Sequence, residues 1–95
     1  MSWIDKILSD YTLSRGARRL AAVIGEQYAA TNARYCSFYD NEAAGQFDTG
    51  SAVIRGYRLE LMRRGYLLEL QAGTGRPNYA LRLGHRIEMD ADNVA

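Results

Sequence analysis

Cysteine, proline, histidine and lysine each occur only once in this sequence. Cys36 has no second thiol with which to form an internal disulfide or a zinc site, and His85 has no neighbouring cysteine or histidine to help hold a metal. A disulfide-rich secreted scaffold and a zinc finger are therefore excluded. We expect the protein to work without a metal or another cofactor.

Long apolar stretches are also missing. No run approaches the roughly 20 apolar residues that a membrane-spanning helix requires. Residues 1–10 lack the basic-then-apolar order of a signal peptide. We expect a soluble protein of the cytoplasm with no membrane partner.

The length and composition predict one small globular domain. The chain has 95 residues, of which 47% are hydrophobic and 24% charged, enough for a single core with any functional site on its surface. No carboxylate pair lies in an apolar stretch, as a general acid and base would require. The Gly73-Thr74-Gly75 turn is not followed by the Gly-Lys-Ser/Thr of a phosphate loop. We therefore do not expect an enzyme.

Positive charge is concentrated in one third of the chain. The whole chain has a net charge of only +1, but residues 53–87 contain seven arginines and two glutamates, a local net charge of +5. Residues 1–52 have a net charge of −1 and residues 88–95 one of −3. Arginine binds phosphate oxygens and guanine edges with two parallel hydrogen bonds, so this cluster favours recognition of an anionic partner.

Helical periodicity predicts four helices. Ser2 and Ser14 are the expected N-caps of the first two, and the second is expected to run to about Ala30. A short third helix begins after Asp40 or Asn41 and runs through Gln46. The fourth and strongest helix covers residues 52–64, with Gly65 ending it in the left-handed conformation.

The remaining segments predict an edge strand and a hairpin. Residues 34–38 form an edge strand or an extended link, and residues 66–71 and 79–83 form two strands joined by a glycine-rich tip that displays Arg76. Alternation predicts that Leu68 and Leu70 on one strand, and Leu81 and Leu83 on the other, form the apolar face of the hairpin.

The fourth helix is predicted to have two distinct faces. At 100° per residue, its buried face consists of Val53, Ile54, Tyr57 and Leu61. The opposite side is small in its first turn and basic further along, and comprises Ser51, Ala52, Arg55, Gly56, Leu59 and Arg63. Ser51 and Asp48 are both candidate N-caps for this helix. A surface of this kind suits the groove of a nucleic acid.

The sequence from Leu13 to Leu83 resembles the winged helix-turn-helix domains of phage and plasmid replication or regulatory proteins. The resemblance rests on the Leu13-Ser14 helix start and on two longer stretches, Leu61-Met62-Arg63-Arg64-Gly65-Tyr66-Leu67 and Gly75-Arg76-Pro77-Asn78-Tyr79-Ala80-Leu81. It implies an α+β fold, mostly helical with a C-terminal β-hairpin wing. We divide the chain into an extra N-terminal amphipathic helix (1–12), the winged helix-turn-helix domain (13–84) and a polar acidic tail (85–95).

The resemblance also implies a function. The chain would be a DNA-binding regulator of transcription or replication that places its fourth helix in the major groove of double-stranded DNA and its wing on the backbone or minor groove. The candidate DNA-binding residues are Ser51, Ala52, Arg55, Arg58, Leu59, Arg63 and Arg76. The outward face of the helix has no Asn or Gln to read adenine, which favours phosphate contacts over base contacts.

A different class of function also fits the sequence. A winged helix can instead bind a protein, for example as a phage-encoded inhibitor of a host complex, and the near-neutral net charge and the outward Ala52, Gly56 and Leu59 favour this alternative. The apolar N-terminal helix (Trp3, Ile4, Ile7, Leu8 and Tyr11) either packs on its own domain or forms a homodimer with a second copy.

Overall fold

All four segments with helical periodicity form helices in the computed structural model, which describes residues 2–29, 34–70 and 76–83. The helices are α1 (Trp3–Leu8), α2 (Arg15–Val23), α3 (Asp40–Phe47) and α4 (Ser51–Arg63). The strands are β1 (Tyr35–Ser37), β2 (Leu67–Glu69) and β3 (Asn78–Leu81). The described part of the chain is therefore an α+β fold with one three-stranded antiparallel sheet.

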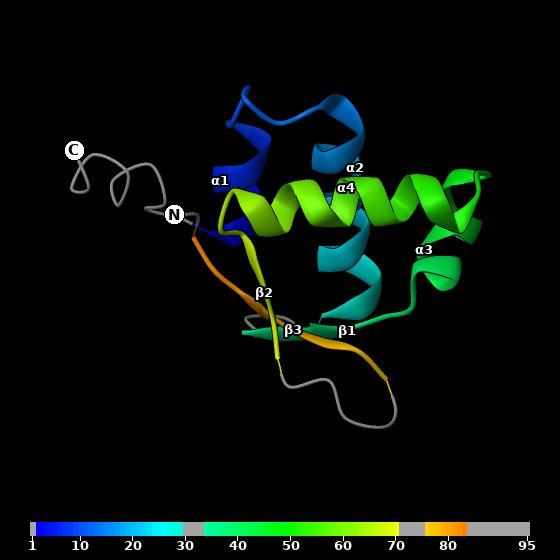
Figure 1. Cartoon of the computed structure of the whole chain (residues 1–95). Helices are drawn as coiled ribbons and strands as arrows, with labels where there is room; N and C mark the ends of the chain where they lie inside the picture. The colour runs from blue at the N-terminus through cyan, green and yellow to red at the C-terminus, as the bar shows by residue number, and fades with distance from the viewer. Residues whose placement is uncertain (1, 30–33, 71–75, 84–95) are drawn as a thin grey trace.

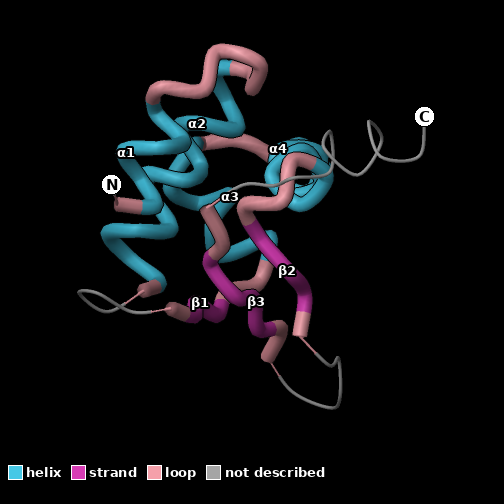
Figure 2. The backbone as a smooth tube through the Cα atoms, turned by 90° about the vertical axis from the view of Figure 1, so that its left-hand side faces the viewer, coloured by secondary structure: helices cyan, strands magenta, loops and turns pink. Residues whose placement is uncertain are grey.

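The sheet has the order β1-β3-β2, so the last strand in the chain is the central one. Figure 2 shows the three strands together at one end of the bundle, below the helices. The predicted edge strand is confirmed, because β1 has only β3 as a neighbour. Figure 1 shows α4 crossing in front of α2, with α3 at the amino-terminal end of α4.

Local capping signals determine where several helices begin and end. The side chains of Ser2 and Ser14 accept hydrogen bonds from the backbone N–H groups of Asp5 and Ala17, as N-caps do. Gly65 has a φ of 81°, the left-handed conformation that was predicted to end α4. These three predictions are confirmed.

The second helix changes its winding before it ends. The α-helical part of α2 stops at Val23, and one π-helical stretch, η1 (Ile24–Tyr28), follows. In η1 the ring of Tyr28 stacks on that of Phe38, with 5.4 Å between the ring centroids. The helical segment ends at Tyr28, because Ala29 is extended, two residues before the predicted end at about Ala30.

One core joins the helices and the sheet. Its largest fully buried side chains come from α1, α2, η1, α4 and the segment before α3, and are Ile7, Leu20, Ile24, Phe38, Ile54 and Leu61. The amphipathic helix α1 belongs to this core through Ile7, and the indole Nε1 of Trp3 donates a 2.9 Å hydrogen bond to the carbonyl of Tyr66. Of the two possibilities left open by the sequence, packing on its own domain is therefore observed for this helix.

The apolar face predicted for the hairpin is wrong by one residue in β2, whereas in β3 the predicted Leu81 does pack against the core, on the same face as Leu67. Leu67 is buried, whereas Leu68 and Leu83 are 46% and 56% exposed. Because successive side chains of a strand point to opposite faces, a shift of one residue exchanges the inner and outer sets. The central strand β3 has a neighbouring strand at each edge, and its Tyr79 and Ala80 are both buried.

The connection between α3 and α4 also differs from the prediction. Asp48 adopts the left-handed conformation, with a φ of 55°, and ends α3. Gly50 is then the N-cap residue of α4, so Ser51 is already the first residue of the helix rather than its cap. The predicted capping role of Ser51 is therefore wrong, and its side chain is exposed.

Candidate functional site

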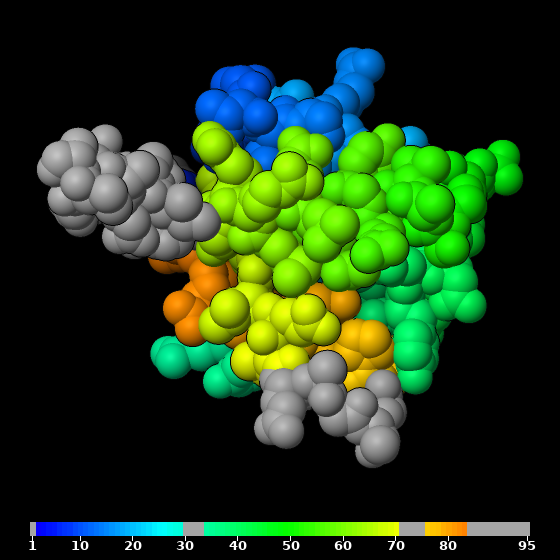
Figure 3. All heavy atoms as spheres, in the orientation of Figure 1, coloured from blue at the N-terminus to red at the C-terminus, as the bar shows by residue number. Residues whose placement is uncertain are grey.

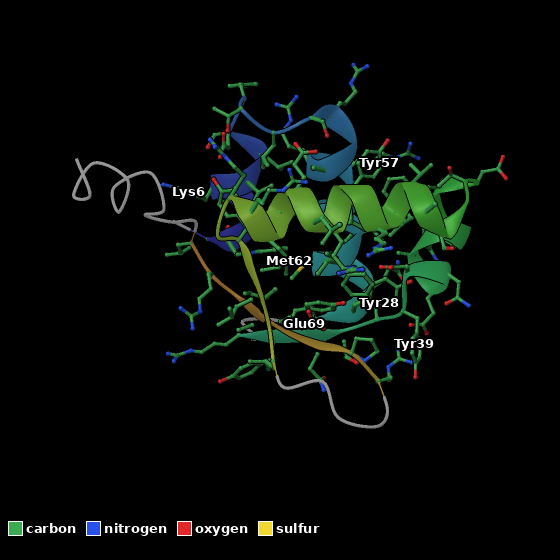
Figure 4. All side chains as sticks on the ribbon, in the orientation of Figure 1. Lys6, Tyr28, Tyr39, Tyr57, Met62 and Glu69 are labelled. Carbon is green, nitrogen blue, oxygen red and sulfur yellow. The ribbon has the colours of Figure 1, made fainter. Side chains whose placement is uncertain are left out.

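The orientation of α4 is fixed by contacts on three of its sides. Ile54 and Leu61 are fully buried and point into the core. Tyr57 lies against Gly16 of α2, and Met62 lies on the opposite side of the helix toward the sheet (Figure 4). A helix held in this way presents only one stripe to solvent.

The exposed stripe of α4 contains most of the candidate residues. Ala52, Arg55, Gly56 and Arg63 are exposed, and Leu59 is half-buried. Figure 3 shows that α4 forms a continuous surface across this face of the molecule, with β2 beneath it. Within the described residues, neither Arg55 nor Arg63 forms an ion pair. Both guanidinium groups are therefore available to an anionic partner.

Val53 does not belong to the buried face as predicted. Its side chain is 43% exposed, although that of its neighbour Ile54 is fully buried. Consecutive residues of an α-helix are separated by 100°, so Val53 falls at the edge of the arc that Ile54 and Leu61 bury. The exposed surface of α4 is therefore wider and more apolar at its first turn than the sequence indicated.

Arg58 lies apart from the other arginines of α4. Its Nε and Nη2 atoms donate hydrogen bonds of 2.8 and 2.9 Å to the two carboxylate oxygens of Asp40. Its guanidinium carbon also lies 5.8 Å from the ring centroid of Tyr79, and its side chain is only 12% exposed. Hydrogen bonding to Asp40 raises the pKa of Arg58, which is therefore always charged. The geometry makes Arg58 a link between α4, α3 and β3.

Arg76 is also held by protein groups. It precedes β3 and forms an ion pair with Glu42 of α3, with 2.6 Å between Nη2 and Oε1. Its side chain remains 44% exposed. The glycine-rich tip on which it was expected to be displayed includes residues 72–75, which lie outside the described residues. The structure thus brings Arg55 and Arg63 together on one helix and gives Arg58 and Arg76 carboxylate partners.

One flanking arginine was not among the predicted site residues. The guanidinium of Arg19 on α2 lies 4.6 Å from the ring centroid of Phe47, and that ring lies 6.3 Å from the ring of Tyr57 on α4. Arg19 therefore lies beside the amino-terminal half of α4, and Arg15 precedes it by one helical turn. The spacing of Arg15 and Arg19 was visible in the sequence, but their position beside α4 depends on how the helices cross.

Cys36 is a packing residue in β1. Its side chain is 3% exposed, and burial raises the pKa of its thiol to about 12. Over residues 2–29, 34–70 and 76–83, no three His, Cys, Asp or Glu side chains are grouped so that they could hold a metal ion. The helices in these same ranges are all too short and too polar to cross a membrane.

Comparisons with protein-family models, with curated proteins and with solved structures gave no match to this chain.

Proposed function

We propose that this chain is a DNA-binding protein of the winged helix-turn-helix class, which regulates transcription or replication by placing α4 in the major groove. The order of elements supports the assignment. A short helix α3, a tight turn and the longer helix α4 are followed by the β2–β3 hairpin, in the order that the sequence resemblance implies. The sheet positions that hairpin beside α4, where a wing lies in this class (Figure 1).

The exposed stripe of α4 is the observation that carries the proposal. Arg55 and Arg63 are exposed on it and have no carboxylate partner among the described residues. The stripe also contains Leu59 and the small residues Ala52 and Gly56, and the small residues permit close approach of a nucleic-acid backbone. Neutralising phosphates with arginines releases counterions, and this release drives sequence-independent DNA binding.

Arg19 and Arg15 extend the proposed surface along the backbone. Arg19 lies on α2 against Phe47, whose ring is near Tyr57 of α4. Arg15 follows Ser14, whose hydroxyl donates a hydrogen bond to Glu60 of α4. Neither arginine forms an ion pair with a described residue. The face then offers two arginines on α4 for the groove and two on α2 for a flanking phosphate strand. This arrangement supports binding governed by phosphate contacts and DNA shape.

Fluorescence anisotropy with a labelled mixed-sequence duplex, titrated at several salt concentrations, tests the proposal. We expect micromolar or tighter binding at low salt that weakens steeply as salt increases. Arg55→Gln and Arg63→Gln should each weaken binding. In a plot of the logarithm of the binding constant against the logarithm of the salt concentration, each substitution should make the slope shallower by about 0.9. Arg34→Gln is the matched control, because Arg34 is exposed beside β1, the edge of the sheet far from α4. Wild-type protein that does not bind even at low salt would exclude the proposal.

A protein-binding module is the second candidate, and the outer face of the sheet favours it. Tyr35 and Leu68 are both cross-strand partners of Ala80, so the three side chains share one face. Tyr35 is 59% and Leu68 46% exposed. A partner protein that copurifies after nuclease treatment, and that is lost on Tyr35→Ser and Leu68→Ser substitution, would favour this candidate.

A further inference from the structure

Arg76 contacts three residues from other parts of the chain, Ser37, Tyr39 and Glu42. We call these three residues and Arg76 the hairpin latch. Its Nε donates to the hydroxyl of Ser37 at 3.1 Å and its Nη2 to the carbonyl of Ser37 at 3.4 Å. Nη2 also donates to Glu42 Oε1 at 2.6 Å, and the guanidinium carbon lies 5.1 Å from the ring centroid of Tyr39. Figure 4 shows Tyr39 at the end of β1 that lies nearest α3.

Glu42 connects this latch to the first turn of α3. The same oxygen, Oε1, accepts a 2.8 Å hydrogen bond from the backbone N–H of Tyr39, the residue before the helix. The Tyr39 hydrogen bond lowers the pKa of Glu42; burial opposes this effect, and the hydrogen bond and charge of Arg76 add to it. The carboxylate is therefore charged at neutral pH, and it links the start of α3 to Arg76, two residues before β3.

The base of the hairpin is held at a second point by the same strand. The hydroxyl of Ser37 donates a 2.9 Å hydrogen bond to the carbonyl of Pro77. Arg76 and Pro77 are consecutive, so both residues that lead into β3 are attached to Ser37 at the end of β1. The start of β3 is thus attached to the end of β1 through Ser37 and to α3 through Glu42.

This geometry is unfavourable for a direct phosphate contact by Arg76. Two of its three guanidinium nitrogens already donate to protein oxygens, and its charge is neutralised by Glu42 at 2.6 Å. A phosphate at the remaining edge would lie close to a carboxylate, and like charges repel. Arg76 therefore fits an orienting role better than the phosphate contact expected from the sequence.

We propose that Glu42 is a positioning residue for DNA binding, which acts by holding Arg76 and thereby fixing the β2–β3 hairpin relative to α4. The inference rests on the proposed DNA-binding function. Glu42 would thus support DNA binding, although its negative charge by itself repels the phosphates of DNA.

Salt-dependent DNA titrations of Glu42→Gln, Arg76→Gln and the double variant test this role. Glutamine at position 42 can still accept the Tyr39 N–H bond, so the substitution removes the charge and keeps the helix start. We expect each single variant to weaken binding by about two- to five-fold, the range that an exposed ion pair can supply. The double variant should bind no more weakly than either single one, and the salt slope should stay unchanged in all three.

Arg76→Lys separates the two roles of the arginine. Lysine retains the charge that a phosphate needs but cannot make the forked contacts to Ser37 and Glu42. Under our proposal Arg76→Lys binds DNA as weakly as Arg76→Gln. Arg82→Gln and Glu26→Gln are the matched controls, because both residues are exposed and form no ion pair with the described residues.

Three results would overturn the positioning role while leaving the proposed function intact. If Glu42→Gln binds DNA more tightly than the wild type, the carboxylate merely repels DNA; if the two proteins bind equally, the carboxylate has no effect on binding. Full rescue by Arg76→Lys, or a salt slope reduced by about 0.9 in Arg76→Gln, would show a direct phosphate contact. Wild-type protein that binds no duplex would instead overturn the proposed function and, with it, this role of Glu42.

Discussion

The ring of Tyr57 covers Gly16 at the point where α4 crosses α2, so that a Cβ atom at position 16 would overlap the ring. The absence of a side chain at one residue thus lets two helices approach closely. Tyr57 in turn packs near Phe47, with 6.3 Å between the ring centroids, which limits the directions in which it can move. Gly16 and Tyr57 therefore set the position of α4 on the domain.

Gly16→Ala is expected to destabilise the protein despite the higher helix propensity of alanine. Propensity alone would favour alanine by about 1 kcal/mol, but displacing a packed ring costs about 1–3 kcal/mol. Gly45→Ala on α3 is the control, because a Cβ there meets no atom within 4 Å. We expect Gly45→Ala to increase, and Gly16→Ala to decrease, the free energy of unfolding in urea. Equal stabilisation by both substitutions would show that Tyr57 moves aside freely.

The ion pair between Asp40 and Arg58 should contribute more to stability than the pair between Glu42 and Arg76. The side chains of the first pair are 23% and 12% exposed, whereas those of the second are 37% and 44% exposed. We expect a double-mutant cycle with Asp40→Asn and Arg58→Met to give a coupling energy of about 1–3 kcal/mol. The corresponding cycle for Glu42 and Arg76 should give a smaller coupling energy, because solvent screens this pair. Similar coupling energies for the two pairs would contradict this expectation.

Local signals allowed much of the fold to be predicted from the sequence. Ser2, Ser14 and Gly65 determine helix ends through hydrogen bonds and a backbone conformation that involve only near neighbours. The face of the hairpin was not predictable in the same way. It depends on which of two adjacent leucines the sheet register turns toward the helices.

The sequence predicted the exposed arginines of the candidate site correctly, but it did not predict which arginines form ion pairs. Arg55 and Arg63 follow from the helical period alone. The partners of Arg58 and Arg76 lie 18 and 34 residues away in the sequence, and only the assembled fold brings them together. A count of arginines therefore overestimated the charge that is available to bind DNA.

Asp10 should make stability depend on pH in the acidic range. Burial would raise the pKa of its carboxyl, but hydrogen bonds from the Thr12 and Tyr66 hydroxyls and the Thr12 N–H, together with nearby Arg64, lower it overall. A pKa that is lower in the folded state stabilises the protein above the unfolded value of about 3.9, and this contribution is lost as pH falls through the folded value.

The comparison of wild type with Asp10→Asn measures this contribution. We expect the urea midpoint of the wild type to fall more steeply than that of the variant between pH 5 and pH 2. Above pH 5 the difference between the two midpoints should be constant, because the carboxyl of Asp10 is fully ionised there in both states. Parallel pH profiles over the whole acidic range would show that the hydrogen bonds of Asp10 do not favour its charged form.

Cys36 should be unreactive in the folded protein. Its side chain is 3% exposed and the pKa of its thiol is raised to about 12, so that the reactive thiolate is both scarce and shielded at pH 8. We expect labelling by a thiol-specific disulfide reagent at pH 8 to be at least about 100-fold slower than in urea-unfolded protein, with a rate set by local opening of β1. Tyr35→Cys in a Cys36→Ala background is the matched control, because Tyr35 is the neighbouring strand residue and is 59% exposed. Rapid labelling of Cys36 under native conditions, at a rate close to that of this control, would mean that β1 leaves the sheet frequently and that the attachment of the hairpin to Ser37 is weak.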